Sequence, residues 1–160
     1  MPVTATPIFV QTPNTGALNA ILSTAMTNTK AFDGTEATGT NMVLVFTAGA
    51  NGSRVDQITC RFASTNGATA SGSSAASLIR FWINNGSVNT SAGNNIFLGE
   101  VAMASTTVTA LGTSVLTVNY LTLPTGGLNL PASYRIYAGS TVAAGGTNIA
   151  FAISAIGGDY

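Results

Sequence analysis

Short runs of β-branched and aromatic residues recur along the whole chain, separated by clusters of Gly, Asn, Ser and Pro. This pattern is typical of an all-β protein, because such side chains fit a pleated, packed surface and the intervening residues favour turns. No segment shows a convincing amphipathic helix. We therefore predict a single domain of seven to nine strands, built as a β-sandwich or barrel. The predicted strands are residues 8–11, 41–47, 77–84, 96–103, 114–123, 133–138 and 148–156, with one more after residue 52 and an ambiguous stretch at 17–24.

The strongest local signal is Asn51-Gly52, which lies between two β-rich runs in the segment FTAGANGSRVDQITCRF. Asn-Gly is the preferred pair for a type I′ turn, because both positions need positive φ. We therefore predict a β-hairpin at this point. Val55 is out of phase with the apolar and polar alternation of residues 57–62, which predicts a β-bulge near Asp56.

Side-chain patterns along these strands also predict the buried residues. Residues 77–84 are largely apolar on both faces, which indicates a central strand or one at an interface. The glycine pairs at 126–127, 145–146 and 157–158 follow or join strands and are interpreted as turns. The predicted core comprises Leu44, Phe46, Ile58, Phe62, Trp82, Val118, Phe151 and Ile153.

Charge is scarce in this chain, and its scarcity limits the partners to be expected. Only 6% of residues are charged, and five basic and five acidic side chains give a formal net charge of zero. Nucleic-acid and anionic-membrane binding need clustered basic residues, whereas the five here are scattered, so neither partner is expected. No apolar run approaches the roughly 18 residues of a membrane-spanning helix. A near-neutral surface favours association, so we predict a homo-oligomer, with a trimer as the expected form.

Two features of the sequence suggest where the chain works. The first positive side chain is Lys30, so the N-terminus lacks the basic region of a secretory signal. Cys60 is the single cysteine, which rules out an intrachain disulfide framework. Both features fit assembly in a reducing cytoplasm.

Residues suited to catalysis are few. The chain has no histidine, which removes the commonest general base and metal ligand. Cys60 lies mid-strand on an apolar face and is interpreted as a core residue. The carboxylates show no convergent pattern, and the loop with Asp33 and Glu36 has too few for a calcium site. We therefore expect no enzymatic activity, no cofactor and no metal. The carboxylates considered are Asp33, Glu36, Asp56, Glu100 and Asp159.

Aromatic residues leave one alternative open. Trp82, Tyr120, Tyr134 and Tyr137 could form a platform for a sugar, but their apolar neighbours favour core packing.

The segment FTAGANGSRVDQITCRF, the later stretch LIRFWINNG and the closing GGDY together resemble a family of small structural proteins of tailed bacteriophages and prophages. The resemblance covers roughly Val43 to Gly86 and the last few residues. It implies a virion component, and above all a capsid decoration (cement) protein with a jelly-roll-like sandwich. Such proteins sit, commonly as trimers, on the outside of the head and bridge subunits of the major capsid (coat) protein.

The first 14 residues form a distinct segment, which we treat as an extended N-terminal arm before a sandwich domain at 15–160. The arm has no charge and contains three prolines, which favour an extended conformation and disfavour a central strand. Its apolar cluster, Ile8, Phe9 and Val10, could add to a sheet edge of another subunit. The alternative is that the arm forms an edge strand of its own sandwich.

Three functions follow as hypotheses. The first is a decoration protein that cross-bridges coat subunits. The second is a tail, fibre or baseplate module, and the third is a carbohydrate-binding β-sandwich.

Overall fold

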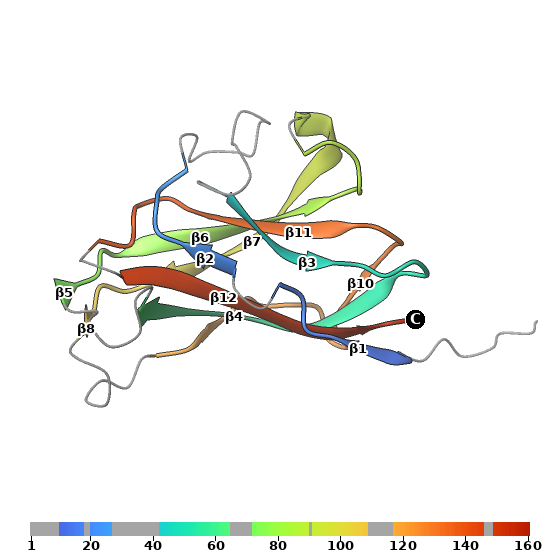
Figure 1. Cartoon of the computed structure of the whole chain (residues 1–160), viewed down its shortest axis with the longest axis horizontal. Helices are drawn as coiled ribbons and strands as arrows, with labels where there is room; N and C mark the ends of the chain where they lie inside the picture. The colour runs from blue at the N-terminus through green and yellow to red at the C-terminus, as the bar shows by residue number, and fades with distance from the viewer. Residues whose placement is uncertain are drawn as a thin grey trace, which may run out of the picture.

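The computed structural model describes residues 10–17, 20–26, 42–64, 72–89, 91–108, 117–145 and 149–160. Within these ranges the strands form two antiparallel sheets, and the only helical element is the short 3-10 turn η1 (Ala92–Asn94). Figure 1 shows the two layers packed face to face. The predicted all-β sandwich is therefore confirmed. The two sheets contain six and four strands, more than predicted, because several of these strands are only two or three residues long.

The larger sheet is built around one long antiparallel pair, β4 (Ser53–Ser64) and β12 (Ile149–Asp159). Four short strands flank this pair. On the β12 side lie β1 (Thr12–Asn14) and β2 (Ala20–Leu22), and on the β4 side lie β9 (Asn119–Tyr120) and β10 (Leu128–Leu130).

The smaller sheet has the strand order β3-β11-β6-β7, and a separate two-stranded ladder joins β5 to β8. The bounds of these strands are β3 (Met42–Thr47), β5 (Gly72–Ser73), β6 (Ser77–Asn84), β7 (Asn95–Met103), β8 (Thr107–Val108) and β11 (Arg135–Ser140).

The connectivity is that of a jelly roll. β1 and β2 share one edge position beside β12, and β9 and β10 share one edge position beside β4. Counted in this way, the strands of the two sheets occupy eight positions, which we number in chain order. The larger sheet then reads 1-8-3-6 and the smaller sheet 2-7-4-5, which is the double Greek-key order of that fold. Only β6 and β7 are consecutive positions in the same sheet; every other step crosses between the layers.

The core lies between the sheets and is rich in phenylalanine. Phe46, Phe81 and Phe151 are fully buried, and the ring of Phe62 lies 4.9 Å from that of Phe151. Six of the eight predicted core residues are buried. Trp82 is one of them, but it belongs to a second cluster with Met26, Met42 and Tyr137.

Two core predictions are wrong, since Leu44 and Val118 are each 38% exposed. The register of β3 against β11 shifts so that Val45 is skipped between Phe46 and Leu44. This bulge buries both Val45 and Phe46, and it leaves Leu44 on the exposed side of an edge strand. Val118 lies outside the sheets, in the segment before β9.

The predicted hairpin at Asn51-Gly52 is also wrong. β3 pairs with β11 and β4 pairs with β12, so this turn crosses from one sheet to the other. The Gly52 N–H donates to the carbonyl oxygen of Gly49 (3.1 Å), and only Gly52 has positive φ (92°), whereas a type I′ turn requires it at Asn51 as well.

The predicted bulge at Asp56 is confirmed. Ile156 pairs with Gln57 and Gly157 pairs with Val55, so Asp56 has no partner across the ladder. The glycine pair 157–158 lies inside β12, so its interpretation as a turn is wrong, whereas Gly126 and Gly127 do form one.

Strand positions were predicted well where the pattern was strong. Residues 77–84 form β6 as predicted, and β7 and β11 lie within two residues of their predicted bounds. The prediction at 114–123 is mostly wrong among the described residues, because only Asn119–Tyr120 is a strand. Residues 10 and 11 are not strand either, and the pairing begins at Thr12.

Candidate interaction surface

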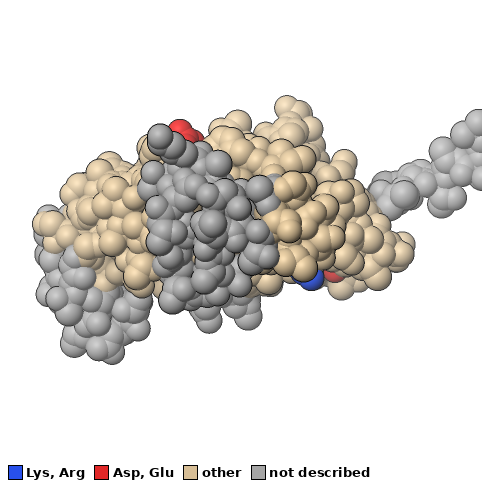
Figure 2. All heavy atoms as spheres, turned by 90° about the horizontal axis from the view of Figure 1, so that it is seen from above, with Lys and Arg blue, Asp and Glu red and all other residues tan. Residues whose placement is uncertain are grey.

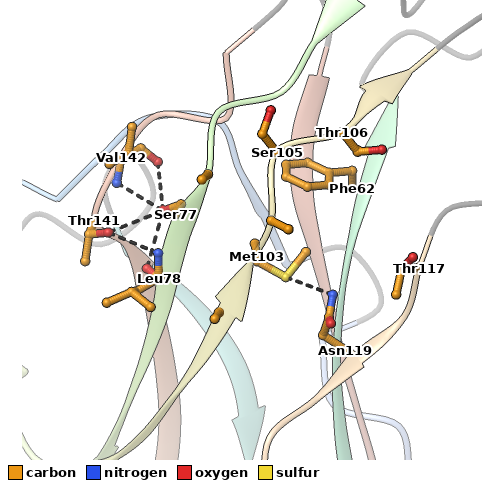
Figure 3. Close-up of a pocket in the computed structure, with 13 residues that line it drawn as sticks. Phe62, Ser77, Leu78, Met103, Ser105, Thr106, Thr117, Asn119, Thr141 and Val142 are labelled. Atoms are coloured by element: carbon orange, nitrogen blue, oxygen red, sulfur yellow. Dashed lines mark hydrogen bonds between the residues drawn. The ribbon is translucent and has the colours of Figure 1, made fainter.

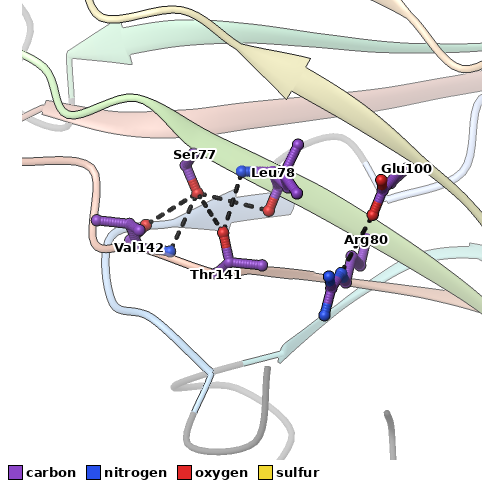
Figure 4. Close-up of polar contacts among 6 residues, drawn as sticks. All are labelled: Ser77, Leu78, Arg80, Glu100, Thr141 and Val142. Atoms are coloured by element: carbon purple, nitrogen blue, oxygen red, sulfur yellow. Dashed lines mark hydrogen bonds and ion pairs between the residues drawn. The ribbon is translucent and has the colours of Figure 1, made fainter. Parts of the chain in front are cut away.

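The described carboxylates lie apart and are engaged in separate contacts. Asp56 Oδ1 is 2.7 Å from Arg54 Nε, and Glu100 Oε2 is 3.2 Å from Arg80 Nε (Figure 4). Asp33 and Glu36 lie outside the described residues. Among the residues that are described, no group of three or more Cys, Asp or Glu side chains could hold a metal ion.

The third described carboxylate, Asp159, fastens three segments together. Its Oδ1 accepts hydrogen bonds from Asn14 Nδ2 (2.8 Å) and from the hydroxyl of Ser53, whose oxygen in turn accepts one from the backbone N–H of Gly49 (2.9 Å). Burial raises the pKa of Asp159, but the hydrogen bonds from Asn14 and Ser53 and the nearby backbone N–H of Gly49 outweigh it and lower the pKa below its usual value. Asp159 thus links β12 to β1 and to the turn between β3 and β4, which is a structural role.

Cys60 lies in the core, as predicted. It is fully buried in β4, and burial raises the pKa of its thiol to about 12. A thiol in this state is a poor nucleophile, because the thiolate is the reactive form.

Aromatic side chains do not form a common exposed platform. Trp82 and Tyr137 are 2% and 6% exposed and pack together in the second cluster, as the core interpretation predicted. Tyr134 is half-buried and packs against the main core, so Tyr120 alone of the four is freely exposed.

One cavity of about 640 Å³ opens near the ends of β6 and β7. Phe62, Leu78 and Met103 supply much of its apolar lining, and Figure 3 shows Asn119 donating to the sulfur of Met103 at 3.4 Å. The described lining carries no charged side chain. The described part of this cavity therefore suits a neutral ligand and offers no acid–base pair.

Ser77 closes one side of this region without being available to a ligand. Its hydroxyl lies 3.4 Å from the hydroxyl of Thr141, donates to the Val142 carbonyl (3.2 Å) and accepts from the Val142 N–H (3.1 Å), as Figure 4 shows. These bonds tie the start of β6 to the segment after β11.

The most distinctive exposed feature is a set of apolar side chains on the β6–β7 hairpin. Ile96 and Phe97 are consecutive in β7 and pair with Ile83 and Trp82, so they present apolar side chains on both faces of this strand. Val88, Ile96 and Phe97 are 64%, 71% and 52% exposed, and none of them has a charged neighbour in sequence. We call these three residues the hairpin patch. The Phe97 ring packs edge-on against Trp82, with centroids 6.0 Å apart. In Figure 1 the connection between β6 and β7, with η1, stands clear of the two layers.

Asparagine side chains hold the hairpin in shape. Asn84 donates to the side chain of Asn95 (2.9 Å), and Asn85 donates to that of Asn94 (3.1 Å). Asn94 in turn donates to the Val88 carbonyl (2.8 Å). The patch is therefore carried on a preorganised loop, which lowers the entropy lost on binding. The sequence signal for this arrangement is the pair of Asn-Asn dipeptides at 84–85 and 94–95, which lie at the two ends of the segment between the predicted strands 77–84 and 96–103.

Charge is sparse on the described surface of one face of the molecule. In Figure 2 the Lys, Arg, Asp and Glu atoms occupy only small spots on the face that is shown. Few ions would have to lose their hydration if this surface were covered.

The predicted arm residues are only partly described. Ile8 and Phe9 lie outside the described residues, while Val10 packs over Gly158 of β12. The Gln11 N–H donates to the Asp159 carbonyl (2.8 Å), and residues 12–14 form β1 in the larger sheet. The arm therefore joins its own sandwich from Val10 onward.

Residues 77–84, predicted to be a central strand or one at an interface, form β6, which lies between β11 and β7 and is therefore a central strand. On its outer face Trp82 is covered within the chain by Met26, Met42 and Tyr137, whereas Leu78 and Arg80 are half-buried. The exposed apolar surface lies instead on the neighbouring strand β7.

Three comparisons with known proteins complete this description. No protein-family model matches the chain, no curated protein is significantly similar to it, and no solved structure matches its fold significantly. Within the described residues, no helix has the length and hydropathy needed to cross a membrane.

Proposed function

We propose that this protein is a non-enzymatic structural component of a bacteriophage virion, and specifically a capsid decoration (cement) protein. It would assemble in the bacterial cytoplasm and bind the major capsid protein on the surface of the head. The observation that carries this proposal is the hairpin patch, three exposed apolar side chains on a projecting hairpin that asparagine hydrogen bonds hold in shape.

The hairpin patch has the properties of a protein-contact site. Exposed apolar clusters on a soluble domain mark interaction surfaces, and a partly exposed aromatic residue such as Phe97 is a typical anchor. A jelly roll alone does not indicate this function, because the fold serves capsid, lectin and enzyme domains alike.

Stabilisation of a shell would come from several weak contacts made together. We assign one contact to the hairpin patch and another to the arm residues Ile8 and Phe9, which would dock on a coat subunit, whereas Val10 packs on its own sandwich. A copy held at two places resists local opening, because both contacts must break before the subunits separate.

Two other functions give different outcomes in the same experiments. A tail, fibre or baseplate module would use similar contacts at low copy number. A carbohydrate-binding domain is less well supported, because Trp82 and Tyr137 are buried and no aromatic platform is formed.

Quantitative mass spectrometry of particles purified from the bacterium that carries the gene tests the proposal. Hundreds of copies per particle support decoration, a dozen or fewer indicate a tail part, and absence from particles refutes both. Incorporation of Ile96→Ser/Phe97→Ser should fall, whereas the matched control Val142→Ser, at an exposed apolar residue after β11, should be incorporated normally. Glycan-array binding by the isolated protein would favour the carbohydrate function.

A further inference from the structure

We propose that the free edge of β7 pairs with β7 of a second copy of this chain, in an antiparallel, two-fold symmetric contact centred on Phe97. This inference names the partner of the hairpin patch and rests on its proposed role as a subunit contact. It replaces the trimer that the resemblance implies with a two-fold pair.

Three of the four edges of the two main sheets, as far as the chain is described, are closed to strand addition. At the β3 edge, the carbonyls of Val45 and Thr47 already accept hydrogen bonds from Ala17 N–H (2.9 Å) and Asn14 Nδ2 (3.1 Å). The edge beside β12 consists of β1 and β2, which have three residues each, and Pro13 is the middle residue of β1. The β9 and β10 edge consists of strands of two and three residues. Proline and short strands are the usual protections of sheet edges.

The fourth edge, β7, lacks these protections. It has nine residues, no proline and no basic residue, and among the described strands it pairs only with β6. Its residues Ile96 and Phe97 are exposed. A long, apolar edge of this kind is a template for another strand.

The identity of the second strand follows from which edges are open. Among the described strands of the two main sheets, β7 is the edge through which two copies of this chain can join, since the other three edges are closed. A contact between identical edges is two-fold symmetric. In such a pair the residue on the two-fold axis lies opposite the same residue of the second copy. Like charges near the axis would repel one another, but Ile96, Phe97 and Leu98 are all neutral.

Centring the pair on Phe97 matches apolar residues with apolar residues. Phe97 then faces Phe97 of the second copy, and Ile96 faces Leu98 on both sides of the axis. Glu100, which is paired with Arg80, faces the neutral Asn94 of the other copy. The register of β7 against β6 shifts between Phe97 and Gly99, so this bulge limits the new ladder to a few residues. The pair should therefore be weak in dilute solution and effective where copies are concentrated on a lattice.

Site-directed cross-linking tests the contact directly. Cys60 is fully buried, so an engineered cysteine is the accessible thiol in the described surface. Under mild oxidation Phe97→Cys should form a covalent dimer at least several times faster than the control Val142→Cys, whose position is similarly exposed. Equal rates for the two variants would overturn the proposal.

Charge reversal tests the symmetry. By sedimentation velocity at high concentration, the native chain should dimerise, while Phe97→Lys and Phe97→Glu should each be monomeric and a mixture of the two should form heterodimers. Circular dichroism checks that each variant keeps its sheet. A native chain that stays monomeric up to millimolar concentration, or a trimer unaffected by Phe97→Lys, contradicts the pairing. If either result were found together with a high copy number on particles, the β7 pairing would be refuted while the decoration function remained supported. The two proposals can therefore be refuted independently.

Discussion

Gly157 lies in β12, next to the Asp56 bulge in its pairing with β4. Replacing Gly157 by alanine gives a quantitative test of this fold. A Cβ at this position would overlap the carbonyl oxygen of Arg54 and lie 2.9 Å from the Cα of Val55. The second distance is about 0.5 Å short of ordinary contact, which begins at 3.4 Å. Both obstructing groups are backbone, so no side chain can rotate away and β4 must move from β12.

The expected cost of Gly157→Ala follows from this overlap. Overpacking costs about 1–3 kcal/mol, and the backbone contact puts this variant in the upper part of that range, at about 2–3 kcal/mol. For a chain of this size each kcal/mol lowers the melting temperature by about 2–4 °C, which predicts a fall of roughly 4–12 °C.

Differential scanning calorimetry measures this fall against a matched control. A methyl group added at Gly93 would have no neighbouring atom within 4 Å, so Gly93→Ala should melt close to the native chain. If Gly157→Ala also melted within a degree of the native protein, the close pairing of β4 and β12 at the Asp56 bulge would be incorrect.

Two further predictions concern titratable groups. Because the folded-state pKa of Asp159 is lowered, its carboxylate adds stability at pH values above the unfolded pKa, near 4, and this contribution is lost as pH falls through the folded pKa. Asp159→Asn should therefore melt below the native chain at pH 7, with a difference that narrows in acid; a difference constant from neutral to acidic pH contradicts the assignment. Cys60, with its pKa raised to about 12, should resist iodoacetamide at pH 8 in the folded protein and react fully in urea, as mass spectrometry would show; rapid alkylation of the folded chain would contradict its burial.

Local patterns in the sequence were sufficient to predict single strands and one irregularity. Residues 77–84 were identified because their β-branched and aromatic content fits a pleated surface over a full strand length. The Asp56 bulge was predicted because Val55 breaks the alternation within one segment. Both signals depend only on neighbours in the chain.

Pairing between strands could not be predicted in the same way. The turn at Asn51-Gly52 needs a left-handed residue at Gly52, and that need is the same whether the chain returns to its own sheet or crosses to the other. The exposure of Leu44 depends on the Val45 bulge, which appears only in the register against β11, far along the chain. The hairpin patch was likewise hidden, because the sequence shows Ile96 and Phe97 as ordinary strand residues until β7 is known to be an edge.

The treatment of the sheet edges connects the fold to the proposed function. A soluble β protein normally blocks every edge, and this chain does so at three of them by three different means: carbonyls already bonded at β3, proline at β1, and short strands at β9 and β10. Leaving β7 open, with apolar residues at 96–98 and Glu100 as its single charged side chain, departs from that rule. The asparagine bonds around it keep the open edge rigid, so the departure is built into a well-ordered element. Departures of this kind are expected where a protein makes its functional contacts, which is why β7 and the hairpin patch are the region to test first.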